Sequence, residues 1–187
     1  MKRAKTLSKQ ELNRVLAVTA AGRNPERNRI VILLSYYAGL RAKEIAELNV
    51  GDIYTDMGEV NRTVLLKANQ TKGNQSRNFV VNSKLAKELD SFRGYAGQSG
   101  NAPLIRSKKN RAFSANSMCQ LICRIYRDSG IAGATSHSGR RTFITNLANK
   151  GVSARVLMEL AGHKNLATTQ GYIDVNDTML LEAAELA

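Results

Sequence analysis

The sequence predicts a mainly α-helical protein that contains one small antiparallel β-hairpin sheet. Apolar residues recur at helical spacing along most of the 187-residue chain, and helix-capping signals separate successive segments. A period-two pattern is confined to two short runs on either side of Lys72-Gly73. With 43% hydrophobic residues, a chain of this length can bury the core of one domain, with or without an appended tail.

Three helical segments are expected at the start of the chain. Ser8-Lys9-Gln10-Glu11 forms a capping box, and the helix behind it should end near Gly22. Asn24-Pro25 then supplies an N-cap and a proline in the first turn, and Gly39 is placed to end this second helix. A short third helix is expected directly after Arg41.

The hairpin is expected in the middle of the chain. The runs T-V-L-L-K and R-N-F-V-V have β-type patterns, and the polar stretch A-N-Q-T-K-G-N-Q-S separates them. Glycine and asparagine favour turns because they tolerate the backbone angles that turns require. Lys72-Gly73 is therefore predicted to lie in the turn of an antiparallel hairpin.

The remaining segments are predicted to be helical, apart from a basic loop between residues 97 and 111. We expect helices that are capped at Ser83 and Ser114, that follow His137, and that span Ser153–Ala161, then a short turn or helix near Thr168–Tyr172 and a final amphipathic helix over residues 177–187.

The charge of the chain favours a polyanionic partner. The formal net charge is +13, and nucleic acid is the first candidate for so basic a globular chain, although a generally solvated basic surface is the alternative. Residues 173–187 carry −4 and residues 1–172 carry +17, so the body suits DNA and the tail does not. No apolar run of about 18 residues predicts a membrane span, and the charged N-terminus lacks an apolar signal region. We expect a cytoplasmic protein.

Both histidines of the chain lie in its C-terminal third, within Thr135–Ile173. His137 and Arg140 stand at i,i+3 where a helix should begin, so they are expected to share a face there. Backbone N–H groups and the helix dipole favour an anion at that point, which makes the pair a candidate phosphate site. Taken alone, a surface pair of histidine and arginine is the commoner interpretation.

Cys119 and Cys123 raise the alternative of a zinc site, because they could combine by residue type with His137 and His163. Their spacing fits no usual zinc-finger pattern, and such a site would use both histidines of the chain. We interpret the cysteines as a core thiol pair on one helix, and we expect neither a metal nor another cofactor.

Four motifs together resemble the tyrosine recombinase (phage integrase) family. They are G-L-R-A-K-E-I-A-E-L around Arg41, T-K-G around Lys72, H-S-G-R-R-T-F around His137, and L-A-G-H-K-N-L-A-T-T-Q-G-Y-I, which contains His163 and Tyr172. They occur in the family's order and at family-like spacing, and the resemblance covers the chain from about Thr6 onward. It implies that residues 1–176 form a catalytic domain of this family, mostly helical with a small hairpin sheet.

The resemblance also implies a reaction on double-stranded DNA. Family members transfer a phosphate of one strand to a tyrosine, which leaves a 3′-phosphotyrosine link and a free 5′-hydroxyl; a 5′-hydroxyl of a second strand then reverses the step. No ATP is consumed, since one phosphodiester is exchanged for another. A DNA-relaxing, type IB-like topoisomerase is the alternative enzyme, and a DNA-binding module of the same fold without turnover is the alternative outside enzymes.

The roles of the candidate residues follow the demands of this chemistry. Tyr172 is the expected nucleophile, and because a free tyrosine hydroxyl has a pKa of about 10 it needs a proton acceptor and a positive field. Arg41 and Arg140 are expected to bind the non-bridging oxygens. Lys72 is the candidate general acid for the leaving 5′-oxygen. By resemblance His137 is a general acid or base near Tyr172, and His163 hydrogen-bonds the phosphate.

Other features qualify the resemblance. The family usually has a large apolar residue where this chain has Gly139, and often histidine where it has Arg141; a glycine in the first turn is expected to loosen the His137–Arg140 face. Glu44 is expected to orient Arg41 or its helix. The acidic helix at 177–187 is expected to dock on a neighbouring copy in a tetramer, or else to fold back on its own domain. Since many relatives carry a further N-terminal domain, the chain is either a catalytic region of a longer protein or a compact single-domain member.

Overall fold

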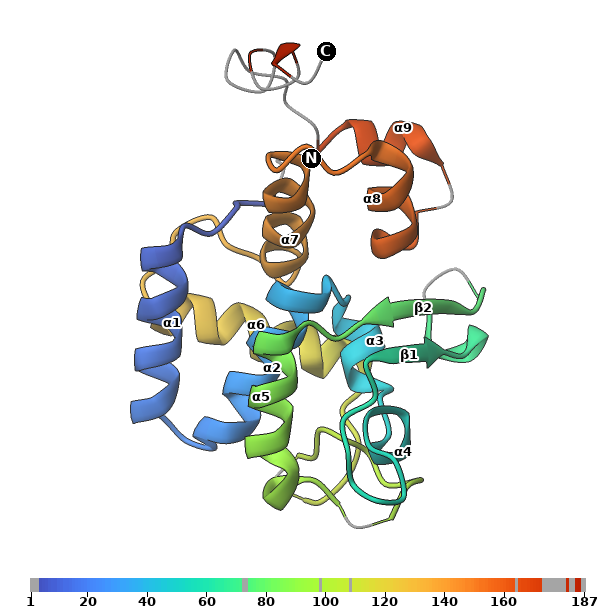
Figure 1. Ribbon diagram of the computed structural model, residues 1–187. Helices are drawn as coiled ribbons and strands as arrows, with labels where there is room; N and C mark the ends of the chain where they lie inside the picture. The colour runs from blue at the N-terminus through green and yellow to red at the C-terminus, as the bar shows by residue number, and fades with distance from the viewer. Residues whose placement is uncertain are drawn as a thin grey trace.

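The computed structural model describes residues 4–71, 74–97, 99–107, 109–163 and 165–172, with residues 181, 184 and 185 of the tail. Within these ranges the chain is helical with one two-stranded sheet, as predicted (Figure 1). The α-helices and strands are α1 (Lys9–Ala21), α2 (Pro25–Ala38), α3 (Ala42–Ala46), α4 (Val50–Ile53), β1 (Thr63–Leu66), β2 (Arg77–Val80), α5 (Ser83–Phe92), α6 (Ala115–Asp128), α7 (Ser138–Ala148), α8 (Ala154–Ala161) and α9 (Leu166–Gln170). Short 3-10 helices lie at Ala68–Gln70 and Arg93–Tyr95.

The predicted ends of α1 and α2 are confirmed, except that the side chain of Asn24 forms no capping hydrogen bond at the start of α2. Ser8 Oγ accepts a hydrogen bond from the Glu11 N–H at 3.1 Å, and the Ser8 N–H donates to Glu11 Oε2 at 2.9 Å, which completes the capping box. Pro25 opens α2, and Gly39 ends it with a left-handed φ of 65°. Ser114 caps α6 as expected, and α8 begins one residue after its predicted start, with Ser153 as its N-cap.

One helix boundary differs from the prediction, and one short helix was not predicted. The N-cap of α5 is Asn82, whose Oδ1 accepts from the Leu85 N–H at 2.9 Å, so the predicted cap Ser83 is instead the first residue of the helix. Asparagine and serine cap equally well, and the sequence does not distinguish neighbours of this kind. The one-turn helix α4 was not predicted, because four residues are too few to show a helical period.

The hairpin has the predicted antiparallel pairing, with Thr63 opposite Val80 and Leu66 opposite Arg77. Val64, Leu66 and Phe79 are buried, whereas their neighbours along each strand are more exposed. This alternation places one face of the sheet on the core and leaves the other open.

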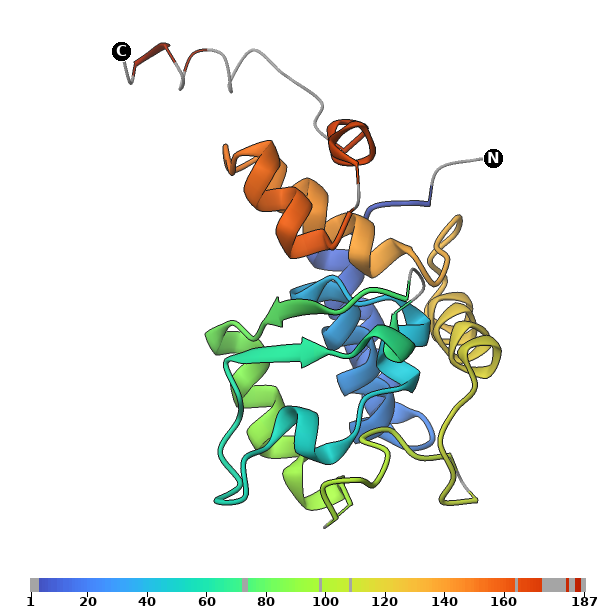
Figure 2. The same cartoon turned by 90° about the vertical axis from the view of Figure 1, so that its right-hand side faces the viewer.

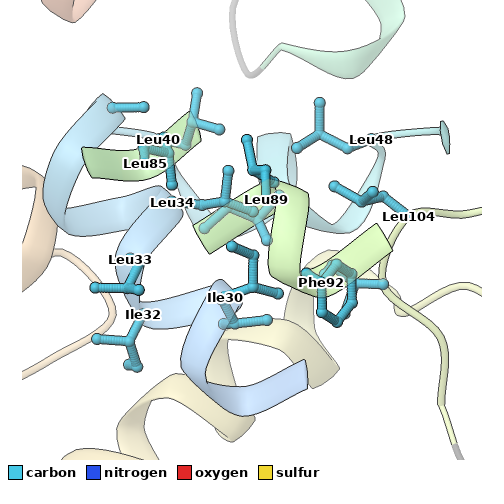
Figure 3. Close-up of a cluster of buried hydrophobic side chains, with 14 of the residues drawn as sticks. Ile30, Ile32, Leu33, Leu34, Leu40, Leu48, Leu85, Leu89, Phe92 and Leu104 are labelled. Atoms are coloured by element: carbon cyan, nitrogen blue, oxygen red, sulfur yellow. The ribbon is translucent and has the colours of Figure 1, made fainter. Parts of the chain in front are cut away.

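Helix α2 forms the centre of the core. Its residues from Ile30 to Leu34 are almost fully buried, and it packs on α1, α5, α6 and α7. Figure 3 shows Leu34 of α2 beside Leu89 of α5, with Leu40 and Leu48 from the two ends of the α3 segment in the same cluster. Burial of each such side chain contributes about 1.5–3 kcal/mol.

Gly139 brings α7 close to α2, and the expectation that it loosens this region was wrong. A Cβ at position 139 would lie 2.6 Å from Ser35 Oγ and 2.9 Å from Ser35 Cβ. At Gly39, a Cβ would likewise lie 2.6 Å from the Phe143 ring. The absence of both side chains lets the helices approach, so the helix that carries Arg140 is fixed against the core.

The C-terminal elements lie on the hairpin side of the molecule. In Figures 1 and 2, α8 and α9 stand above the hairpin, and α7 connects them to the helical core. The predicted helix at 177–187 lies outside the described residues except for Leu181, Ala184 and Glu185. Among the described parts of the chain, no helix is long and apolar enough to span a membrane.

Candidate functional site

An open groove of about 870 Å³ lies between β2 and the segment of α8 and α9. Arg77, Asn78 and Val80 form one wall, and residues 158–160 of α8 form the other. Arg41 and His163 also line it, although more than a hundred positions separate them in the sequence. The groove therefore brings together residues of the motifs around Arg41 and His163, with Thr71 from the T-K-G motif.

Arg41 is held at the start of α3 by Glu44. The Arg41 N–H donates to Glu44 Oε2 at 2.8 Å, and Arg41 Nη1 donates to Glu44 Oε1 at 2.9 Å. The Arg41 side chain remains 23% exposed, whereas that of Glu44 is fully buried. The structure thus supports the expectation that Glu44 orients Arg41 toward the groove.

Arg77 completes this cluster and was missed as a functional residue. Its Nη2 donates to Glu44 Oε2 at 2.7 Å and its Nε to Glu44 Oε1 at 3.2 Å. Burial opposes ionisation of Glu44, but hydrogen bonds and charges from Arg77 and Arg41 outweigh it, so the pKa of this carboxyl lies below its ordinary value. The signal in the sequence was Glu44 itself, since a carboxylate that is buried requires a cationic partner.

The path of Arg77 depends on Gly162. This residue ends α8 with a left-handed φ of 59°, and a Cβ there would lie 2.3 Å from Arg77 Cδ. Arg77 Nη1 also donates to the Leu160 carbonyl at 3.4 Å. Arg77 therefore joins the hairpin to the end of α8, immediately before His163.

Arg140 is buried, with only 4% of its surface exposed. Its Nη1 donates to the Gly39 carbonyl at 2.6 Å and its Nη2 donates to the Ala161 carbonyl, so the guanidinium bridges the C-terminal ends of α2 and α8. Those ends carry unpaired carbonyls and the negative end of each helix dipole, which favour a cation. Burial, reinforced by the nearby charge of Arg41, lowers the pKa of Arg140 to about 9.

His163 follows α8 and is half-buried. Its Nδ1 lies 2.9 Å from Oγ1 of Thr169, a fully buried residue of α9. Burial, together with the charges of Arg140, Arg41 and Arg77, lowers the pKa of His163 to about 4. The imidazole is therefore neutral at pH 7, with one nitrogen engaged by Thr169 and one N–H or lone pair left for another partner.

Tyr172 lies just beyond α9, and its ring packs on two side chains. The His163 ring is 5.7 Å away between centroids and inclined by 26°, and Arg141 Cζ lies 5.2 Å from the Tyr172 ring centroid. The Tyr172 N–H donates to the Thr169 carbonyl at 2.9 Å. Thr169 thus anchors both His163 and the turn that carries Tyr172.

The structure gives less information on the two other predicted site residues, His137 and Lys72. His137 is the residue before α7; its side chain is exposed, so it does not share one exposed face with the buried Arg140. Its carbonyl accepts from the Arg141 N–H at 2.8 Å. Lys72 lies outside the described residues, and its neighbour Thr71 lines the groove.

Other tyrosines have structural environments. The Tyr54 hydroxyl donates to the Leu89 carbonyl at 2.7 Å, and burial raises the pKa of Tyr54 to about 12. Tyr36 and Tyr37 pack edge to face on α2, and Tyr126 is fully buried in α6.

Cys119 and Cys123 are free thiols on α6, and within the described ranges no group of three or more potential metal ligands gathers.

Comparison with known proteins agrees with this geometry. The model of the phage integrase family matches residues 5–179. The chain belongs to the tyrosine recombinase (phage integrase) family. Tyrosine recombinase XerA of Thermococcus kodakarensis is 31% identical over 185 residues, which cover 98% of this chain and 62% of the relative. XerA of Pyrococcus furiosus is 28% identical over 187 residues, with coverage of 98% and 62%. This family member therefore spans about three-fifths of the length of these relatives.

Solved structures confirm the fold of this tyrosine recombinase domain. The crystal structure of XerA recombinase superposes with a TM-score of 0.75 at 22% identity, covering 100% of this chain and 64% of that one. The Tn1549 transposon integrase, in complex with circular intermediate DNA, gives a TM-score of 0.74 at 20% identity, with coverage of 100% and 68%. The predicted fold class, a mainly helical tyrosine recombinase domain with a small hairpin sheet, is thus confirmed.

Proposed function

We propose that this chain is the catalytic region of a site-specific DNA recombinase that cleaves and rejoins strands through a 3′-phosphotyrosine at Tyr172. One observation carries the proposal: the Tyr172 ring packs on the imidazole of His163, and burial together with the charges of Arg140, Arg41 and Arg77 lowers the pKa of that imidazole to about 4. A tyrosine that packs on His163, which itself lines the groove and lies in the field of three arginines, is an arrangement suited to a phosphodiester.

The proposed step exchanges one ester for another. The Tyr172 hydroxyl oxygen attacks the phosphorus, and its proton passes to His137. The bond from phosphorus to the 5′-oxygen breaks, and this oxygen takes a proton from Lys72. The product is a 3′-phosphotyrosine and a 5′-hydroxyl, and attack by a 5′-hydroxyl on the phosphotyrosine reverses every transfer.

Charge stabilisation in this step falls to the arginines and His163. Arg41 lines the groove and keeps N–H donors that Glu44 does not use, which supports its proposed role of binding a non-bridging oxygen. Arg140 uses one N–H from each of its two terminal nitrogens to bind the carbonyls of Gly39 and Ala161, and these bonds orient the guanidinium before substrate binds. The neutral His163 would add a hydrogen bond without the cost of desolvating another cation.

Double-stranded DNA is the proposed substrate. The body of the chain carries +17, and solved structures with this fold include the XerH recombinase bound to its difH substrate and a lambda integrase dimer bound to a core site. Binding dominated by phosphate contacts should weaken steeply with salt. An enzyme with this substrate would work in the cytoplasm, on the nucleoid.

We also propose that the acidic segment 177–187 docks on the basic body of a neighbouring copy and supports a tetramer on paired sites. Its composition supports this idea, since residues 173–187 carry four acidic residues and no lysine or arginine. Deletion of 177–187 should abolish strand exchange between two sites and spare cleavage of one site. Tetramer formation that survives the deletion would instead indicate that the segment folds on its own domain.

A nicked suicide duplex tests the proposed function. The duplex is selected from a random pool for tight binding, and a nick near the scissile phosphate lets the cleaved end diffuse away. The chain should form a covalent adduct that resists EDTA and is lost in Tyr172→Phe. Binding without an adduct would indicate a DNA-binding module, and relaxation of supercoiled DNA without paired sites would indicate a topoisomerase.

A further inference from the structure

We infer that Arg141 is a positioning residue that holds the ring of Tyr172 for attack. The inference rests on the proposed function, because it matters for chemistry only if Tyr172 is the nucleophile.

The contact has the geometry of a cation–π interaction. Arg141 Cζ lies 5.2 Å from the centroid of the Tyr172 ring, within the range of about 6 Å in which a guanidinium is attracted to an aromatic face. The His163 ring packs on the same tyrosine at 5.7 Å. A cation from α7 and an imidazole from the end of α8 therefore both hold the ring.

Arg141 is available to contact Tyr172 because the adjacent Arg140 is the residue that bonds to the protein interior. Successive residues of a helix point about 100° apart, so Arg140 turns inward to Gly39 and Ala161 while Arg141 does not. In the described part of the chain, no carboxylate forms an ion pair with Arg141, and the Tyr172 ring is its side-chain partner.

The backbone places Arg141 beside another proposed reactant. Its N–H donates to the His137 carbonyl, so Arg141 lies one turn after His137 on α7. Through Arg141, the helix that presents the proposed proton acceptor also contacts the proposed nucleophile.

Tyr172 needs the contact with Arg141, because its own segment of the chain has few anchoring interactions. Helix α9 has five residues, and of these only Thr169 is buried. The backbone tie of Tyr172 is its N–H bond to the Thr169 carbonyl. Helix α7, in contrast, is fixed to the core through Gly139 and Ser35. In-line attack requires the reacting atoms to lie within about 3–3.5 Å of each other, so the position of the Tyr172 ring must be well defined. Contact with Arg141 on the fixed helix α7 restricts the ring more than α9 alone would.

The test compares Arg141→Met, Arg141→Lys and a matched control, Arg155→Met, on the nicked duplex at saturating DNA. Arg155 is an exposed arginine of α8, so its substitution removes one charge without touching Tyr172. We expect the rate of adduct formation in Arg141→Met to fall about 3- to 30-fold, the range that a cation–π contact supports. Arg141→Lys should recover part of the rate because it keeps the cation, and Arg155→Met should match the unmodified chain.

Two results would overturn the inference. The first is an unchanged saturating rate in Arg141→Met; the second is a loss confined to DNA affinity, which would make Arg141 a phosphate contact only. A fluorine NMR signal from 3-fluorotyrosine at position 172 separates this failure from that of the proposed function, because it needs no DNA. Arg141→Met should shift the signal toward that of free fluorotyrosine, and Arg141→Lys should shift it less. An unshifted signal contradicts the contact, whereas a shifted signal in a chain that forms no adduct contradicts the proposed function alone.

Discussion

Arg77 donates two hydrogen bonds to the fully buried carboxylate of Glu44, at 2.7 and 3.2 Å. The same carboxylate receives the backbone and side chain of Arg41, so one anion fixes a strand residue and a helix N-cap at the edge of the groove. The position of Arg41 therefore depends on a residue of the hairpin as well as on its own helix.

Substitution Glu44→Gln should destabilise the protein by about 3–5 kcal/mol, because it leaves the buried ends of Arg77 and Arg41 without their counter-charge. Urea unfolding at pH 7 measures this. Glu88→Gln is the matched control, since Glu88 forms a similar two-bond pair with Arg29 but at the surface. It should cost at most about 1 kcal/mol. Equal losses in the two variants would contradict the account of the Glu44 cluster.

The Glu44 cluster should also make stability depend on acid. The folded-state pKa of Glu44 is depressed, so its contribution is present above the unfolded value of 4.5 and is lost as pH falls through the folded value. Urea midpoints measured from pH 7 to pH 3 should decline less in Glu44→Gln than in the unmodified chain. Parallel declines would show that Glu44 is not the group responsible.

His163 should remain neutral to about pH 4. A base with a depressed folded pKa binds protons more readily when unfolded, so acidification from pH 6.5 to about pH 4 should reduce stability through this residue. Proton NMR of the two imidazoles measures the titration, and His137→Gln assigns the signals. If the His163 signal titrated near pH 6.5, the combined effect of burial and the three arginines would be refuted.

Arg140 should be required for stability as well as for cleavage. Arg140→Lys keeps a charge but lacks the planar fork that reaches both Gly39 and Ala161, so it should lose about 1.5–3 kcal/mol, and Arg140→Ala should lose more. Both should fail to form the DNA adduct. A melting temperature equal to that of the unmodified chain in Arg140→Ala would show that the carbonyl bonds contribute nothing.

Gly139→Ala should destabilise the contact between α2 and α7 by about 1–3 kcal/mol through overpacking against Ser35. The double variant Ser35→Gly, Gly139→Ala should recover part of this loss, since the Ser35 side chain is then gone. Thermal unfolding of the two single variants and the double variant gives the coupling energy. Strict additivity would show that the two residues do not meet.

Local signals predicted most of the fold. Caps such as Ser8 and the glycine Gly39 act within a few residues of their helix, so the sequence contains the whole signal. The sequence did not predict α4, because one helical turn is too short to show a period. It did not give the exact N-cap of α5, because the neighbours Asn82 and Ser83 are both good capping residues. Gly139 was misjudged because its role depends on Ser35, which is distant in the sequence.

In the candidate site, too, contacts between residues close in sequence were predicted, whereas contacts between distant elements were not. The pairing of Arg41 with Glu44 spans one helical turn and was expected from the sequence. The partners Arg77 and Thr169 come from other elements, and they meet Glu44 and His163 only when the hairpin and α8 close on the groove. The family motif made Tyr172 the candidate nucleophile, but it did not indicate that Arg141 packs on its ring.

The most direct test of the central claim is to locate the DNA link by mass spectrometry. Trypsin cleavage after Lys164 releases residues 165–187, a peptide whose single tyrosine is Tyr172. After reaction with the nicked duplex and nuclease digestion, we predict that this peptide carries a 3′-phosphorylated nucleotide on Tyr172. A link to any other peptide, or an adduct that persists in Tyr172→Phe, would contradict the claim that Tyr172 is the nucleophile.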